Sequence, residues 1–193
     1  RLWNSRDKKL VDLDPVIPGE VRMYNCGPTV YSDPHIGNFR SFLMGDLLRR
    51  VIDQRGFKTT HVVNITDVGH LTTDDVADAS GEDKLEKEAR EQGIDPFEIA
   101  RKYEEVFHTN ARQLNFRLAH EYPRATDHIP EMIEMIEKLI ERGHAYEVEG
   151  VGVYFRVHSF EKYGCLSGTR VRSESRTALV RIEEMQVSKR KLA

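Results

Sequence analysis

The chain has 193 residues, and its 29 lysines and arginines against 32 aspartates and glutamates give a formal net charge of −3. Hydrophobic residues make up 39% of the chain, enough for the core of one domain or of two small ones. No stretch approaches the ~18 consecutive apolar residues of a membrane helix, and the N-terminus lacks the apolar segment of a secretory signal. Cys26 and Cys165 are the only cysteines, which excludes a disulfide framework and predicts a reducing, cytoplasmic setting.

A strand, a helix and a second strand are predicted near the start of the chain. Residues 21–26 are typical of a short buried strand. Apolar residues at helical spacing predict a helix over about residues 35–54 that ends at Gly56, and the β-branched residues 58–65 predict the second strand. Because parallel strands need such a crossover, this order predicts a βαβ unit.

The rest of the chain is predicted to be mainly helical, with one hairpin. Helices are expected over residues 84–92, from residue 95 through 107, and over 129–142. Residues 145–148 and 151–157 flank a Glu-Gly turn and predict a β-hairpin. We therefore predict an α/β fold in which a nucleotide-binding half with a parallel sheet is followed by a helical and hairpin insertion.

Charge is spread unevenly along the sequence. Residues 74–91 carry eight acidic and three basic side chains, whereas residues 169–193 carry seven basic and three acidic ones. Solvated helix faces or a loosely ordered tail account for both runs, although a basic tail can also contact phosphates.

Candidate site residues follow the first strand, where ligands of open parallel sheets bind. His35 and Asn38 lie three positions apart at the predicted helix start, so both can project toward one point above its N-terminus. Gly37 leaves room for a ligand to approach the backbone, and the free N–H groups of a helix N-terminus suit a triphosphate. His and Asn side chains can donate to phosphate oxygens as charge moves onto pyrophosphate. Capping or packing of the helix end is the alternative role for this pair.

Residues 35–38 (HIGN) resemble the HIGH signature of the class I aminoacyl-tRNA synthetases, and their surroundings resemble the cysteinyl-tRNA synthetases in particular. The resemblance covers about residues 1–168. The segments that carry it, in the family's order, are residues 23–31, 35–40, 64–68, 123–132 and 163–168.

The resemblance implies a Rossmann-like catalytic domain that activates cysteine with ATP and Mg²⁺, releases pyrophosphate, and transfers cysteine to tRNA(Cys). Residues 1–73 would form the first half of this domain, residues 74–168 a connective insertion, and residues 169–193 a basic tail. The residues that would face ATP are Thr29, Tyr31, His35, Gly37 and Asn38, with His35 and Asn38 also catalytic.

For the amino acid, the resemblance implies contacts from Gly27 and Thr66 and a Zn²⁺ ion that binds the substrate thiolate. Cys26 would be one zinc ligand, which agrees with the preference of zinc for soft thiolates. A thiolate bound to the metal would exclude serine without an editing step. The alternatives are an inert buried role for Cys26 and a helix-cap role for Thr66.

The end of the sequence departs from the cysteinyl pattern. Residues 186–192 resemble the second class I signature, KMSKS, in the form of the glutaminyl and glutamyl enzymes, and Lys189 would then stabilise pyrophosphate. A plain basic tail is the alternative, because no strand is predicted before this segment.

Several parts of the family's pattern are expected outside this sequence: the other three zinc ligands, the second nucleotide-binding half and the anticodon-binding domain. We therefore expect an N-terminal portion of a synthetase with reduced or no activity alone. Two other functions remain open. One is a cysteine ligase that acts on an amino-sugar without tRNA, and the other is a non-catalytic, synthetase-like binding module.

Overall fold

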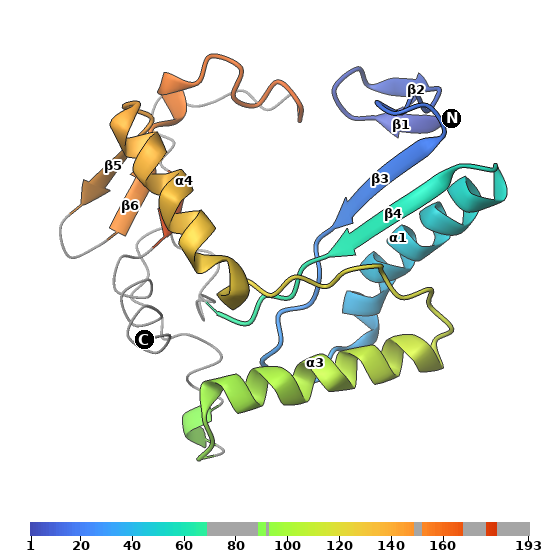
Figure 1. The fold of residues 1–193 in the computed structure, drawn as a ribbon, viewed down its shortest axis with the longest axis horizontal. Coiled ribbons are helices and arrows are strands. Elements are labelled where there is room, and N and C mark those ends of the chain that lie inside the picture. Colours follow the sequence, from blue (N-terminus) through green and yellow to red (C-terminus); the bar gives the residue numbers. More distant parts are fainter. Residues whose placement is uncertain (69–88, 92, 149–151, 168–176, 181–193) are drawn as a thin grey trace. The chain divides into compact units, whose positions relative to one another are not determined.

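The computed structural model describes residues 1–68, 89–91, 93–148, 152–167 and 177–180 (Figure 1). The chain divides into two compact units. Arg1–Asp14 and Ile129–Ala193 form the first, and Pro15–His128 form the second. The expected boundary at residue 73, between the first half of the catalytic domain and a connective insertion, stays a prediction.

The second unit is built on the predicted βαβ arrangement. Strands β3 (Glu20–Asn25) and β4 (Lys58–Val63) pair in parallel, and helix α1 (Ile36–Gln54) connects them and runs alongside them in Figure 1. Gly56 ends the connection with a φ of +84°, a value that glycine adopts without strain. The prediction that the first strand is buried was only half right. Val21 is buried, but Tyr24 on the opposite face is 67% exposed.

A second helix and a further parallel segment complete this unit. Helix α3 (Pro96–Gln113) begins at Asp95, whose carboxylate accepts a hydrogen bond from the Phe97 N–H at 2.8 Å, as predicted for an Asp-Pro helix start. Isolated parallel bridges join Val62 of β4 to Glu121, and Ile65, two residues after β4, to Arg124. A short 3₁₀ helix, η1 (Thr126–His128), follows. An aromatic cluster packs α1 against α3, with Phe39 and Phe107 stacked at its centre, 5.9 Å apart.

The first unit contains the predicted third helix and hairpin. Helix α4 (Ile129–Glu141) ends before Gly143, and strands β5 (Ala145–Val148) and β6 (Gly152–Phe155) pair antiparallel. Ile136, Ala145 and Val153 form their core. The 3₁₀ helix η2 (Val157–Ser159) comes next.

Three strands of this unit were not predicted. β1 (Leu2–Asn4) and β2 (Lys9–Val11) form an N-terminal hairpin. β7 (Thr177–Val180) pairs antiparallel with β6, which corrects the expectation that no strand precedes the basic segment at the end of the chain. The helix predicted over residues 84–92 lies largely outside the described residues, of which 89–91 are helical. Where the structure describes the chain, no helix is long and apolar enough to cross a membrane.

Candidate functional site

A cavity of about 270 Å³ opens beyond the carboxyl end of β3, next to the start of α1. Five of the residues predicted to bind substrates line it, namely Gly27, Thr29, Tyr31, His35 and Asn38. Cys26, Gly37 and Thr66 are not among its lining residues. Lys189 lies outside the described residues.

The start of α1 is held by a reciprocal capping box. The Nδ1 atom of His35 accepts a hydrogen bond from the Gly37 N–H at 3.0 Å, and the His35 N–H donates to Oδ1 of Asn38, also at 3.0 Å. These bonds place the proton of the neutral imidazole on Nε2 and leave the Asn38 NH₂ group free of the cap. Both side chains therefore cap the helix and keep a donor for an anionic oxygen.

Gly37 does not provide the open space that the sequence suggested. A Cβ atom added there would lie 2.8 Å from Cε1 and 2.9 Å from Nδ1 of His35. The imidazole ring occupies this position, so the absence of a side chain at Gly37 makes room for the cap.

A second polar cluster lies across the ends of β3 and β4. Tyr24 donates its hydroxyl hydrogen to Oδ1 of Asn64 at 2.8 Å, and the Gly27 N–H donates to the same oxygen at 3.0 Å. Nδ2 of Asn64 donates to Oγ1 of Thr66 at 3.1 Å. Thr66 itself pairs with Thr29 in a parallel bridge, so it continues the sheet rather than capping a helix. The two residues predicted to contact cysteine, Gly27 and Thr66, thus share one neighbour, Asn64.

Cys26 lies beside this cluster with an exposed thiol, which excludes the alternative that it is a buried, inert residue. Cys165, the second cysteine, is exposed in the other unit. No three histidine, cysteine or acidic side chains come together as a metal-binding group within the part of the chain that the structure describes. A tetrahedral zinc ion needs four ligands, so Cys26 would have to be joined by three ligands from elsewhere.

Asp67 anchors the end of the β4 segment. Its buried carboxylate accepts hydrogen bonds from the N–H and the hydroxyl of Thr126, at 3.0 and 2.5 Å. Nearby, Arg124 forms two hydrogen bonds with Glu104, at 2.8 and 3.0 Å, and this partner raises the pKa of the guanidinium. These contacts fix the segment after β4 that carries Asn64 and Thr66.

The opposite face of the same two strands holds a buried histidine that sequence reasoning missed. Nε2 of His61 is 2.8 Å from Oδ1 of Asn25, whereas its buried Nδ1 has no hydrogen-bond partner in the described structure. Burial lowers the pKa of His61, and the nearby Arg49 lowers it further. A neutral histidine therefore ties β3 to β4 on the side that faces α1.

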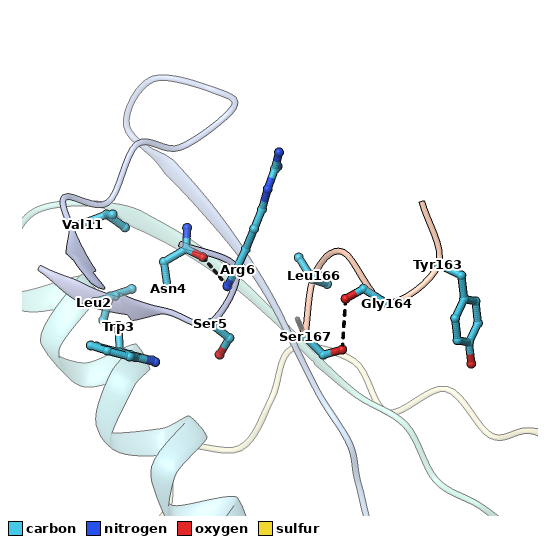
Figure 2. A pocket seen from close by; sticks show the side chains of 10 residues that line it. All are labelled: Leu2, Trp3, Asn4, Ser5, Arg6, Val11, Tyr163, Gly164, Leu166 and Ser167. Carbon is cyan, nitrogen blue, oxygen red and sulfur yellow. Dashed lines mark hydrogen bonds between the residues drawn. The ribbon is translucent and has the colours of Figure 1, made fainter. Parts of the chain in front are cut away.

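The first unit contains a separate cavity of about 830 Å³ (Figure 2). It lies between the N-terminal hairpin, with Trp3 and Arg6, and the turn that carries Tyr163 and Leu166. The only bonds drawn there are local: the Arg6 N–H donates to the Asn4 side chain, and the Ser167 hydroxyl donates to the Gly164 carbonyl. None of the predicted site residues lines this cavity.

Comparison with known proteins identifies the family. Residues 12–192 match the profile of the class I (C) tRNA synthetase catalytic domain. The chain belongs to this family. Among curated relatives, it is 45% identical over 183 residues to the cysteine–tRNA ligase of a Thermus thermophilus strain, covering 95% of this chain and 37% of the relative. It is 41% identical over 171 residues to the ligase of Pyrococcus abyssi, covering 89% and 33%.

This class I synthetase chain therefore spans about a third of the length of these relatives. Its fold is similar to a Mycobacterium tuberculosis methionyl-tRNA synthetase solved with methionyl-adenylate, with a TM-score of 0.53 and 18% identity over 81% of this chain and 28% of that one. A leucyl-tRNA synthetase of Agrobacterium radiobacter K84, solved with tRNA and LeuAMS, also gives a TM-score of 0.53, at 23% identity over 74% and 17%. At these identities the likeness establishes the α/β fold of the class I catalytic domain.

Proposed function

We propose that this chain carries the ATP- and cysteine-binding part of a cysteine–tRNA ligase. The ligase would activate cysteine with ATP to cysteinyl-adenylate, release pyrophosphate, and then transfer the cysteine to tRNA(Cys). The observation that carries the proposal is the shared position of two polar clusters. The capped start of α1 and the residues around Asn64 both lie at the carboxyl edge of β3 and β4.

The first cluster would bind ATP. His35 Nε2 and the Asn38 NH₂ group are the donors left by the capping box, and Thr29 and Tyr31 line the same cavity. In the reaction, a carboxylate oxygen of cysteine attacks the α-phosphorus of ATP, and the bond to pyrophosphate breaks. Donors at His35 and Asn38 would stabilise the negative charge that moves onto the leaving group. The positively charged side chain of Lys189 would further stabilise the pyrophosphate leaving group.

The second cluster would bind cysteine. Gly27 and Thr66 would contact the amino acid, and Cys26 would supply one thiolate ligand of a Zn²⁺ ion. The exposed thiol and the chemistry of zinc support this assignment. The ion would select cysteine over serine through the substrate sulfur.

Cysteine-dependent ATP–pyrophosphate exchange tests the proposal. Exchange by the 193-residue chain should require cysteine and should be slow, because three zinc ligands and the second nucleotide-binding half are expected outside this sequence. Cys26→Ala should lower the rate by more than about tenfold because it removes a metal ligand. Cys165→Ala is the matched control, since it removes the other exposed thiol, and its rate should remain within about twofold of the parent.

Isothermal titration with ATP alone separates the two halves of the proposal. ATP should bind the parent and Cys26→Ala equally, because Cys26 does not line the cavity at the start of α1. A folded chain that binds neither ATP nor cysteine would contradict the proposal.

A further inference from the structure

Asn64 lies directly after β4 and reaches the end of β3 on the open face of the sheet. It is half-buried, and its side chain bonds to three residues from two strand ends, Tyr24, Gly27 and Thr66. The chain separations are 40, 37 and 2 positions. One amide therefore joins the two segments that are proposed to hold the amino acid.

The chemistry of the partners fixes which way this amide points. A backbone N–H can only donate, so the atom that faces Gly27 must be the oxygen. The NH₂ group then faces Thr66 and donates to Oγ1. Thr66 accepts this bond and keeps its own hydroxyl hydrogen to donate elsewhere. Tyr24 uses its hydrogen on Asn64 and can offer only oxygen lone pairs to a ligand.

The backbone at this point leaves little freedom for another arrangement. A Cβ atom added to Gly27 would lie 1.7 Å from the carbonyl oxygen of Asn64. Two residues further along, Thr29 and Thr66 form a parallel β-bridge. In it the Val30 N–H donates a hydrogen bond to the Thr66 carbonyl at 3.1 Å. Asn64 is therefore held by its main chain while its side chain orients its neighbours.

We propose that Asn64 is a positioning residue that sets the hydrogen-bond polarity of the amino-acid site. It keeps Thr66 as a donor and Tyr24 as an acceptor. This pair matches the carboxylate and the ammonium group of a zwitterionic amino acid, for which a donor and an acceptor are needed. The inference rests on the proposed function and adds to it a residue that acts through Thr66.

Asn64→Asp reverses the direction of the hydrogen bond between residue 64 and Thr66 while it keeps nearly the same side-chain shape. A carboxylate still accepts from Gly27 and Tyr24, but it cannot donate to Thr66, whose hydroxyl then turns its hydrogen to the new oxygen. Asn64→Ala removes all three bonds. Thr66→Val removes the hydroxyl itself, and Thr60→Val is the matched control, because it changes an exposed threonine on the same face of β4.

Two measurements on the 193-residue chain test the inference. Amide hydrogen exchange at Gly27, followed by NMR, should accelerate by about tenfold in Asn64→Ala and stay within about twofold in Asn64→Asp. In pyrophosphate exchange, Asn64→Asp and Thr66→Val should each raise the KM for cysteine by about tenfold and leave the KM for ATP within about twofold. Thr60→Val should change neither.

The double variant gives the decisive comparison. If Asn64 acts through Thr66, adding Asn64→Asp to Thr66→Val should raise the cysteine KM by less than about twofold more. The inference would be overturned if the two substitutions raised the cysteine KM independently, so that their fold-changes multiplied in the double variant. It would also be overturned if the KM values for cysteine and ATP rose equally. A folded parent chain that binds neither ATP nor cysteine would contradict the proposed function. Unchanged hydrogen exchange of the Gly27 amide in Asn64→Ala would overturn the inference by itself, whether or not the chain binds its substrates.

Discussion

The capping box at the start of α1 and the cluster around Asn64 occupy the same edge of the sheet but are assembled differently. The bonds of the capping box span two and three positions of the sequence, whereas Asn64 is bonded to residues 37 and 40 positions away. A local cluster forms whenever its helix forms. A cluster joined across strands exists only when the strands are in register, so its binding geometry depends on the packing of the sheet.

Gly27→Ala breaks the cross-strand cluster and should have the largest effect on stability. The new Cβ would meet the Asn64 carbonyl oxygen at 1.7 Å, and a backbone atom in a paired segment cannot rotate away. We expect a loss of about 3 kcal/mol in the free energy of unfolding, at the upper end for overpacked sites. Urea unfolding should be followed by circular dichroism, because the single tryptophan, Trp3, lies in the other unit. A loss below about 1 kcal/mol would mean that the two strand ends can separate.

The pH dependence of stability tests the other face of the same strands. Burial, Arg49 and His120 lower the pKa of His61 below its ordinary value of 6.5, although Asp46 opposes them. The unfolded chain therefore binds this proton more tightly, and the stability from a neutral His61 is complete above about pH 6.5 and is lost as the pH falls toward the folded pKa. The slope should reach at most about 1.4 kcal/mol per pH unit for each such histidine.

His61→Asn should flatten this slope between about pH 7.5 and 5.5. His108, whose pKa is also lowered mainly by burial, should contribute a second, separable slope. Identical slopes in the parent and in His61→Asn would show that this histidine does not carry the acid sensitivity. The readout is the midpoint of urea unfolding at each pH.

The difference between local contacts and contacts across strands explains how much of the molecule could be predicted from the sequence. Periodicity and end signals locate α1, α3 and α4, because a helix is fixed by neighbours three and four positions apart. The parallel pairing of β3 and β4 follows from the helix between them. The strand β7 was missed because its partner β6 lies more than 20 positions earlier, so no short hairpin turn joins the two strands.

Site residues follow the same rule. His35 and Asn38 could be paired from their spacing alone, and the alternative that they cap the helix describes their bonds correctly. Asn64 lies within a segment that resembles the family, but nothing in its immediate sequence indicates a contact with Gly27. His61 was read only as part of a β-branched strand, since its burial depends on α1 and on the segment that contains His120.

Gly37→Ala is the local counterpart of Gly27→Ala and should have almost no net effect on stability. Its Cβ would meet the His35 ring at 2.8 Å, but that ring can rotate away at the loss of its cap, which costs about 1 kcal/mol. Alanine in place of glycine stabilises a helix by about the same amount, so the two terms should cancel within about 0.5 kcal/mol.

His35→Ala alone removes the helix cap without the gain in helix propensity that alanine brings at position 37. This variant should therefore be less stable than the parent by about 1 kcal/mol. In that background Gly37→Ala has no ring to displace and should instead stabilise the chain by about 1 kcal/mol. This reversal of sign, measured by the same urea titrations, distinguishes a clash with a side chain from a clash with the backbone. A loss of 2 kcal/mol or more in Gly37→Ala, a size about that of a core defect, would mean that the imidazole is held as firmly as the strand ends.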